Sequence, residues 1–176
     1  MSSFYLMKGD LTRTASVDAI VTLINSEGAW FGGVDGAIQR VAGGQYHAQA
    51  GEVLNSKGLR NGQVVVAKGN RGNHRGSFDD VIFVVDDLKS PLGELVYTAC
   101  KTAKREGYGS IAFPLMRTGV MLGAVEPDVK AVVKEMRKGF DRFTAEGQTD
   151  MEIYVVVYAE PEAVKMLSAS MKLIES

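Results

Sequence analysis

Cysteine is almost absent from this chain of 176 residues, in which Cys100 is the only one. A single cysteine cannot form an internal disulfide, so disulfide-stapled folds are excluded and we expect a reducing, cytoplasmic location. The sequence also lacks an apolar run of membrane-spanning length, and its first residues do not resemble a secretory signal. We therefore expect a protein that does not interact with membranes.

The chain lacks a strong charge of either sign, because 20 basic residues nearly balance 21 acidic ones and leave a net charge of −1. Such a balance argues against a strongly electrostatic binder of nucleic acid or membranes. Histidine is scarce as well, since only His47 and His74 occur, and neither has an evident partner ligand. We predict no metal site and no cofactor.

What the chain does contain is a regular alternation of apolar strands and amphipathic helices. Hydrophobic residues make up 45% of the chain, and no linker or repeat divides it, so residues 1–176 are predicted to form one domain. Strands are expected over residues 4–8, 19–24, 64–67, 81–85, 111–113 and 153–158, with helices between them. This order predicts an α/β fold with helices on both faces of a mixed sheet.

Several helix ends are also predicted. Ser90 is a good N-cap before Pro91 at the first helical position, and Pro127 is expected to open the next long helix. Gly107 suits a left-handed helix end. The last helix is expected to begin at Pro161, with Val164, Leu167, Met171 and Ile174 on its apolar face.

The segment 18–42 is the most informative stretch. An apolar run from Ala19 to Ile24 suits a strand that is buried on both faces, and it stops at Asn25. The pair Gly32-Gly33 then precedes a helical pattern. Glycines let a ligand approach the backbone closely, and free N–H groups at a helix start attract phosphate. This pattern predicts a phosphate-binding loop.

In this segment the sequence resembles the macrodomain family, whose members bind ADP-ribose and in some cases hydrolyse ADP-ribose linkages. The resemblance rests on the segments 9–12, 17–21 and 32–38 with Asn25, and on a second match in 110–114 and 118–120. Two separated motifs in the right order make the match specific, and it extends over nearly the whole chain. It implies a three-layer α/β/α sandwich whose two motif loops meet in one cleft at the strand carboxyl ends.

The resemblance also implies roles for individual residues. Asp10 would accept a hydrogen bond from the adenine amino group, with the Leu11 backbone nearby, although a turn or N-cap aspartate is the alternative. Asn25 and Asp35 would hold the distal ribose, and in hydrolytic members Asp35 would orient or activate a water. Backbone N–H groups would bind the two phosphates at Gly32, Gly33, Val34, Thr118, Gly119 and Val120.

This chain departs from the family pattern in ways that put hydrolysis in doubt. Thr22 stands where hydrolytic members usually carry a second asparagine, and Trp30 and Phe31 replace glycines. Arg117 replaces a small hydroxyl residue, so it is expected either to clamp a phosphate or to point to solvent. Met121 stands where an aromatic residue often covers the distal ribose.

Three functions remain open. The first is a slow hydrolase of ADP-ribosyl or O-acetyl-ADP-ribose linkages. The second is a non-catalytic module that binds ADP-ribose or an ADP-ribosylated protein. The third is an RNA- or poly(A)-binding protein that uses the glycine-rich loop 68–80 with Arg71 and Arg75. It ranks lowest because the net charge is near zero and no aromatic residue separates those arginines. The alternative interpretation of residues 68–80 is a solvated hairpin connection without a role in binding.

Overall fold

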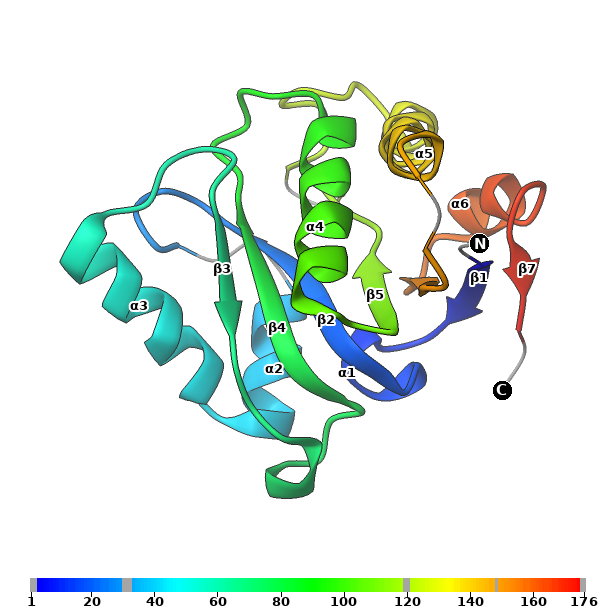
Figure 1. The fold of residues 1–176 in the computed structure, drawn as a ribbon. Coiled ribbons are helices and arrows are strands. Elements are labelled where there is room, and N and C mark those ends of the chain that lie inside the picture. Colours follow the sequence, from blue (N-terminus) through cyan, green and yellow to red (C-terminus); the bar gives the residue numbers. More distant parts are fainter. Residues whose placement is uncertain (1–2, 30–32, 119–120, 148, 175–176) are drawn as a thin grey trace.

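A seven-stranded sheet forms the centre of the molecule, with the strand order β3-β4-β2-β5-β6-β1-β7 (Figure 1). The computed structural model describes residues 3–29, 33–118, 121–147 and 149–174. The strands are β1 (Ser3–Lys8), β2 (Val17–Ile24), β3 (Val64–Ala67), β4 (Phe78–Val85), β5 (Ser110–Pro114), β6 (Glu152–Val157) and β7 (Lys172–Leu173). The β3–β4 pair is antiparallel and every other pair is parallel, which confirms the mixed sheet.

Helices cover both faces of this sheet, so the predicted three-layer arrangement is confirmed (Figure 1). Side chains of α4, α5 and α6 pack into one core, and those of α2 and α3 pack into the other. The helices are α1 (Leu11–Thr14), α2 (Gly33–Ala42), α3 (Gln45–Lys57), α4 (Leu92–Glu106), α5 (Val129–Ala145) and α6 (Pro161–Leu167).

Strand β2 lies between the two cores, as its near-continuous apolar run predicts. Ala19, Val21 and Leu23 belong to the core under α4 and α5. Ile20 and Ile24 face the opposite way and belong to the core under α2 and α3. Because successive side chains of a strand point to opposite faces, only a strand covered on both sides needs such a run.

Two of the predicted helix starts are wrong. Ser90 does not cap α4, because its hydroxyl accepts a hydrogen bond from Asn61 and its carbonyl accepts one from Arg117. Pro91 occupies the N-cap position instead. Helix α5 begins two residues after Pro127, because the Asp128 side chain accepts a hydrogen bond from the Ala131 N–H. The left-handed end of α4 at Gly107, with φ of 79°, is confirmed.

The C-terminal helix is shorter than predicted. Helix α6 ends at Leu167, so Met171 and Ile174 do not extend its apolar face. The chain then joins the sheet as β7, and the N–H of Ile174 donates to the carbonyl of Leu6 in β1. Periodicity alone did not distinguish these residues from another helical turn, because Met171 is buried in either arrangement.

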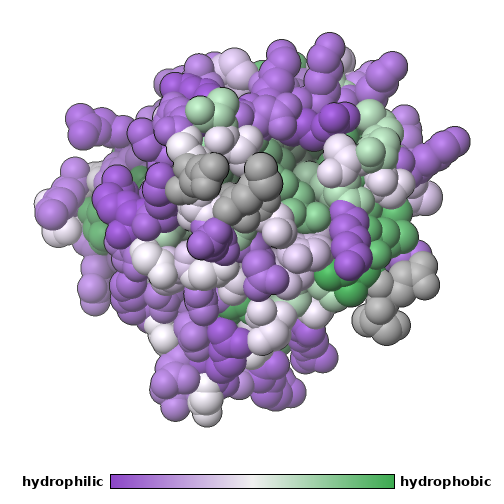
Figure 2. Space-filling view, turned by 45° about the vertical axis from the view of Figure 1, so that its right-hand side comes forward, coloured by the Kyte–Doolittle hydropathy of each residue, from purple (hydrophilic) through white to green (hydrophobic). Residues whose placement is uncertain are grey.

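The surface is largely polar, and hydrophobic side chains gather over a smaller area of the face in Figure 2. Among the described residues, exposed large hydrophobic side chains are few, and Tyr158, with a relative exposure of 78%, stands out among them. Within the described ranges, no helix has the length and apolar character needed to cross a membrane. In the same residues, no group of histidine, cysteine and acidic side chains is arranged to hold a metal ion.

Candidate functional site

A cavity of about 600 Å³ opens where β1, β2, β5 and β6 reach their carboxyl ends. Parallel α/β sheets bind ligands at this edge, because the loops that leave the strands meet there. Seven of the predicted site residues line the cavity: Asp10, Leu11, Gly33, Val34, Arg117, Thr118 and Met121. Gly32, Gly119 and Val120 lie outside the described residues, as do Trp30 and Phe31. The two predicted motif loops therefore converge on one cavity.

Asp10 has the N-cap role that the sequence offered as one alternative, and its adenine contact stays a prediction. It is the N-cap of α1, and its Oδ1 accepts hydrogen bonds from the N–H and the hydroxyl of Thr12, each at 2.8 Å. Oδ1 makes both of these bonds, and Oδ2 has no hydrogen-bond partner among the described residues, while Asp10 lines the cavity. A capping aspartate can thus hold α1 and still accept a hydrogen bond from a ligand.

The N-terminus of α2 forms a second part of the cavity wall. Gly33 and Val34 line it, and Asp35 lies in the first helical turn. The first N–H groups of a helix have no partner within the helix and carry partial positive charge, which favours an anion there. Across the cavity, Thr118 belongs to the loop after β5 and lines the same space.

Arg117 lines the cavity, and the prediction that it points to solvent is wrong. Its side chain is 1% exposed, so it does not point to solvent. The guanidinium instead makes two bonds to Asp86, at 2.8 and 3.0 Å, and contacts Glu126 at 2.8 Å. It also donates to the carbonyl of Ser90 at 2.7 Å. These bonds occupy the guanidinium, so a ligand phosphate would have to compete with two carboxylates for it.

This buried group, Arg117 with Asp86 and Glu126, shapes the second motif loop. Burial alone would lower the pKa of Arg117, but its hydrogen bonds to both carboxylates raise it. The backbone N–H of Leu92 donates to Glu126, which adds a partner for the second carboxylate. Arg117 also has a φ of 55°, a left-handed conformation that persists only where surrounding bonds hold it.

Asn25 does not line the cavity in this structure; it organises the loop that follows β2. Its Oδ1 accepts hydrogen bonds from the N–H groups of Glu27 and Ala29, at 3.0 and 2.8 Å. The backbone of Asn25 adds bonds to Gly28 and Ala29. The side-chain oxygen is thus committed to the loop, and the amide nitrogen is the group left for a ribose hydroxyl. The ribose role of Asn25 stays a prediction.

Asp35 also does not line the cavity, because it contacts a histidine of the next helix. Its Oδ1 lies 2.5 Å from Nε2 of His47 in α3, whose side chain is 9% exposed. Burial lowers the pKa of His47 below 6.5, although the Asp35 carboxylate opposes this shift. No chemistry was assigned to His47 from the sequence, because only the packing of α3 beside α2 reveals this contact.

Three further cavity residues with polar side chains were missed by the sequence reasoning. Tyr158 and Glu160 follow β6, and Arg40 lies on α2. The signal for Arg40 was present, because Gly33, Ala37 and Arg40 are spaced to lie along one face of a helix. Tyr158 stands directly after a strand end, a position where ligand-binding side chains are common in α/β proteins.

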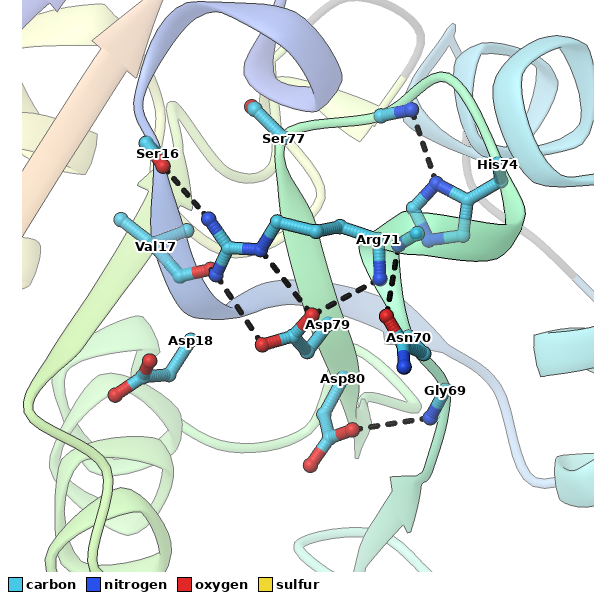
Figure 3. Close-up of polar contacts among 12 residues, drawn as sticks. Ser16, Val17, Asp18, Gly69, Asn70, Arg71, His74, Ser77, Asp79 and Asp80 are labelled. Atoms are coloured by element: carbon cyan, nitrogen blue, oxygen red, sulfur yellow. Dashed lines mark hydrogen bonds and ion pairs between the residues drawn. The ribbon is translucent and has the colours of Figure 1, made fainter.

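The loop 68–77 connects the antiparallel strands β3 and β4 (Figure 3). It precedes β4 and lies beside the start of β2, at the end of the sheet opposite to the cavity. Arg71 bonds to both carboxylate oxygens of Asp79, to the Ser16 hydroxyl and to the Val17 carbonyl. Arg75 donates to the carbonyl of Arg40. Both guanidiniums thus bond within the protein, as expected for a hairpin connection, and RNA binding by this loop has no support in these contacts.

The fold and site define an α/β/α sandwich with a glycine-lined cavity at the carboxyl edge of its sheet. Residues 21–131 match the family described as Macro domain, so the chain belongs to the macro domain family. It is similar to an O-acetyl-ADP-ribose deacetylase of Escherichia fergusonii, with 32% identity over 90% of each chain.

Solved structures show the same fold. A macrodomain of Oceanobacillus iheyensis with ADP is 24% identical, has a TM-score of 0.71 and covers 94% of this chain and 93% of its own. A Trypanosoma brucei macrodomain in complex with ADP-ribose is 23% identical and has a TM-score of 0.72. That match covers 93% of this chain and 67% of the other.

Proposed function

We propose that this protein binds ADP-ribose, free or attached to a protein, in the cavity at the carboxyl ends of β1, β2, β5 and β6. The observation that carries the proposal is the convergence of both motif loops on one space of about 600 Å³. This volume lies in the usual range for small-molecule sites. The names of the similar proteins, an O-acetyl-ADP-ribose deacetylase and macrodomains with ADP-ribose or ADP, support the same ligand.

In this proposal the adenine lies at the end of the cavity lined by Asp10 and Tyr158. Oδ2 of Asp10 accepts a hydrogen bond from the adenine amino group. The exposed ring of Tyr158 offers a flat apolar surface, which a bound base would cover. The phosphates lie between the N-terminus of α2 at Gly33 and the loop at Thr118.

A calorimetric titration with ADP-ribose tests the proposal. We expect micromolar affinity, about −8 kcal/mol. Ligand binding to the folded state also raises thermal stability, so millimolar ADP-ribose should raise the melting temperature. Neither heat nor a thermal shift at millimolar ADP-ribose would reject it. The proposed location is the cytoplasm, on the basis of cysteine scarcity.

Hydrolysis of ADP-ribosyl or O-acetyl-ADP-ribose linkages is the second candidate, favoured by the name of the Escherichia fergusonii relative. Asp35 would serve as the base that activates a water, with Asn25 on the distal ribose. In this structure Asp35 contacts His47, so catalysis requires its carboxylate to turn towards the cavity. That requirement, together with Thr22 in place of an asparagine, makes slow turnover the expected result.

Single-turnover assays at saturating substrate separate catalysis from binding. Loss of a positioned base typically lowers the rate by about 10²- to 10⁴-fold, so Asp35→Ala should do the same. Thr22→Asn should raise the rate with little change in affinity if the missing amide limits turnover. If Asp35→Ala kept the turnover of the wild type, the catalytic base would have to be another residue.

A further inference from the structure

Arg40 occupies a distinctive place in the cavity wall. Together with Gly33 and Ala37 it lines the cavity from one face of α2. Apart from Arg117, it is the basic residue that lines this space within the described residues. Since Arg117 is bound to Asp86 and Glu126, Arg40 is the remaining candidate for a charge that meets the ligand.

The Arg40 side chain runs back towards the start of its own helix. Its Nη1 lies 3.3 Å from the position that a Cβ on Gly36 would occupy. Side chains on a helix tilt towards the N-terminus and cover the preceding turn, and here the missing side chain of Gly36 leaves room for the guanidinium. With a rise of 1.5 Å per residue, Gly36 lies about 4.5 Å along the axis from Gly33.

The guanidinium of Arg40 also has no bonding partner in the part of the chain that the structure describes. Among the residues that the structure describes, none forms a hydrogen bond or ion pair with the Arg40 side chain, whereas its backbone carbonyl accepts a bond from Arg75. The acidic residues that line the cavity, Asp10 and Glu160, lie beyond ion-pair distance of it. An arginine that has free donors and reaches back to within about one turn of a helix N-terminus is well suited to a diphosphate, which it can bind with two parallel hydrogen bonds.

We propose that Arg40 is the residue by which this cavity recognises the diphosphate of its ligand. It supplements the N–H groups at the start of α2 with a full positive charge, and it makes the site selective for nucleoside diphosphates over uncharged nucleosides. This inference rests on the proposed binding of ADP-ribose, and it assigns to Arg40 the phosphate contact that the sequence suggested for Arg117.

The test compares Arg40→Gln, Arg40→Lys and wild type by calorimetry with ADP-ribose. Removing a hydrogen-bonded charge should lower the affinity of Arg40→Gln about 10- to 100-fold. Arg40→Lys keeps the charge without the paired donors, so its affinity should lie between the two. Added NaCl should weaken ADP-ribose binding more in the wild type than in Arg40→Gln. Arg137→Gln removes an exposed arginine of α5 that does not line the cavity, and it should bind like wild type.

Adenosine, measured by ligand-observed NMR, provides the uncharged control. It should bind wild type and Arg40→Gln equally, because Arg40 contacts only the phosphates in this proposal. Equal losses for adenosine and ADP-ribose would overturn the inference, because they would show a general change of the cavity. ADP-ribose binding by Arg40→Gln within two-fold of wild type would overturn it as well, while leaving the proposed function intact. A wild type that binds no ADP-ribose would instead reject the proposed function.

Discussion

Removing the positive charge from the buried group of Arg117, Asp86 and Glu126 should be severely destabilising. Arg117→Met keeps much of the side-chain volume but leaves two carboxylates, 0% and 5% exposed, without their cation. Breaking a buried ion pair by removing one partner costs about 3–5 kcal/mol. For a domain of this size, each kcal/mol corresponds to roughly 2–4 °C in melting temperature. We therefore expect the melting temperature to fall by about 6–20 °C.

Arg71 provides a matched control for burial. It also makes a double contact with one carboxylate, Asp79, and a bond to a backbone carbonyl, Val17 (Figure 3). Its side chain is 36% exposed, however, and that of Asp79 is 39% exposed. An exposed pair is worth only about 0.2–1 kcal/mol, so Arg71→Met should lower the melting temperature far less than Arg117→Met.

Circular dichroism at neutral pH, with thermal and urea unfolding on the same samples, measures both variants. The triple variant Arg117→Met with Asp86→Asn and Glu126→Gln contains no uncompensated charge in this group. It should therefore recover part of the lost stability. A smaller loss of stability in Arg117→Met than in Arg71→Met would refute the reasoning, because burial would then not determine how much an ion pair's loss destabilises the fold.

Three further predictions follow from other features. Asp10→Ser keeps a capping oxygen but removes the second carboxylate oxygen. It should therefore melt like wild type yet bind ADP-ribose about 10-fold or more weakly, whereas Asp10→Ala should lower both the melting temperature and the affinity. Burial lowers the pKa of both His47 and His74 below 6.5, so the unfolded chain takes up more protons and stability should fall as the pH drops below 6.5. A melting temperature that does not change from pH 7 to 5 would contradict this. His74→Gln should make the melting temperature depend less steeply on pH. In Gly139→Ala the new Cβ would lie 2.5 Å from the Gly93 carbonyl, so urea unfolding should show a loss of about 1–3 kcal/mol, and an unchanged midpoint would contradict it.

The sheet could be predicted because its signals are local. The apolar run of β2 required burial on both faces, and the structure places Val21 and Ile20 in opposite cores. Gly107 ended α4 as a left-handed residue because glycine reaches that conformation without a steric cost. The predicted capping of α4 by Ser90 was wrong because it depends on distant residues: Asn61 and Arg117 both bond to Ser90.

The site was predictable in its backbone loops and less so in its charged side chains. Gly33 and Thr118 line the cavity because their loops follow strands that end at the same edge. The role of Arg117 depends on Asp86 and Glu126, which reach it only through the packing of three separate segments. No spacing in the sequence brings these residues together.

The position of β1 within the sheet has a consequence for how the chain is made. Strand β1 pairs with β6, so that Phe4 lies beside Ile153, and with β7, where Leu6 lies beside Leu173. Both partners lie far downstream of β1 and are synthesised only after β2 to β5. At ordinary translation rates β1 therefore waits on the order of 10 s for its neighbours.

During that interval β1 lacks both of the strands that flank it in the sheet. Leu6, which is fully buried in the finished protein, reaches that burial only when β6 and β7 arrive. Pairings of such long sequence separation form slowly, because the loop between them must close first. We therefore expect the growing chain to be more prone to aggregation before β6 has emerged than after it has paired with β1.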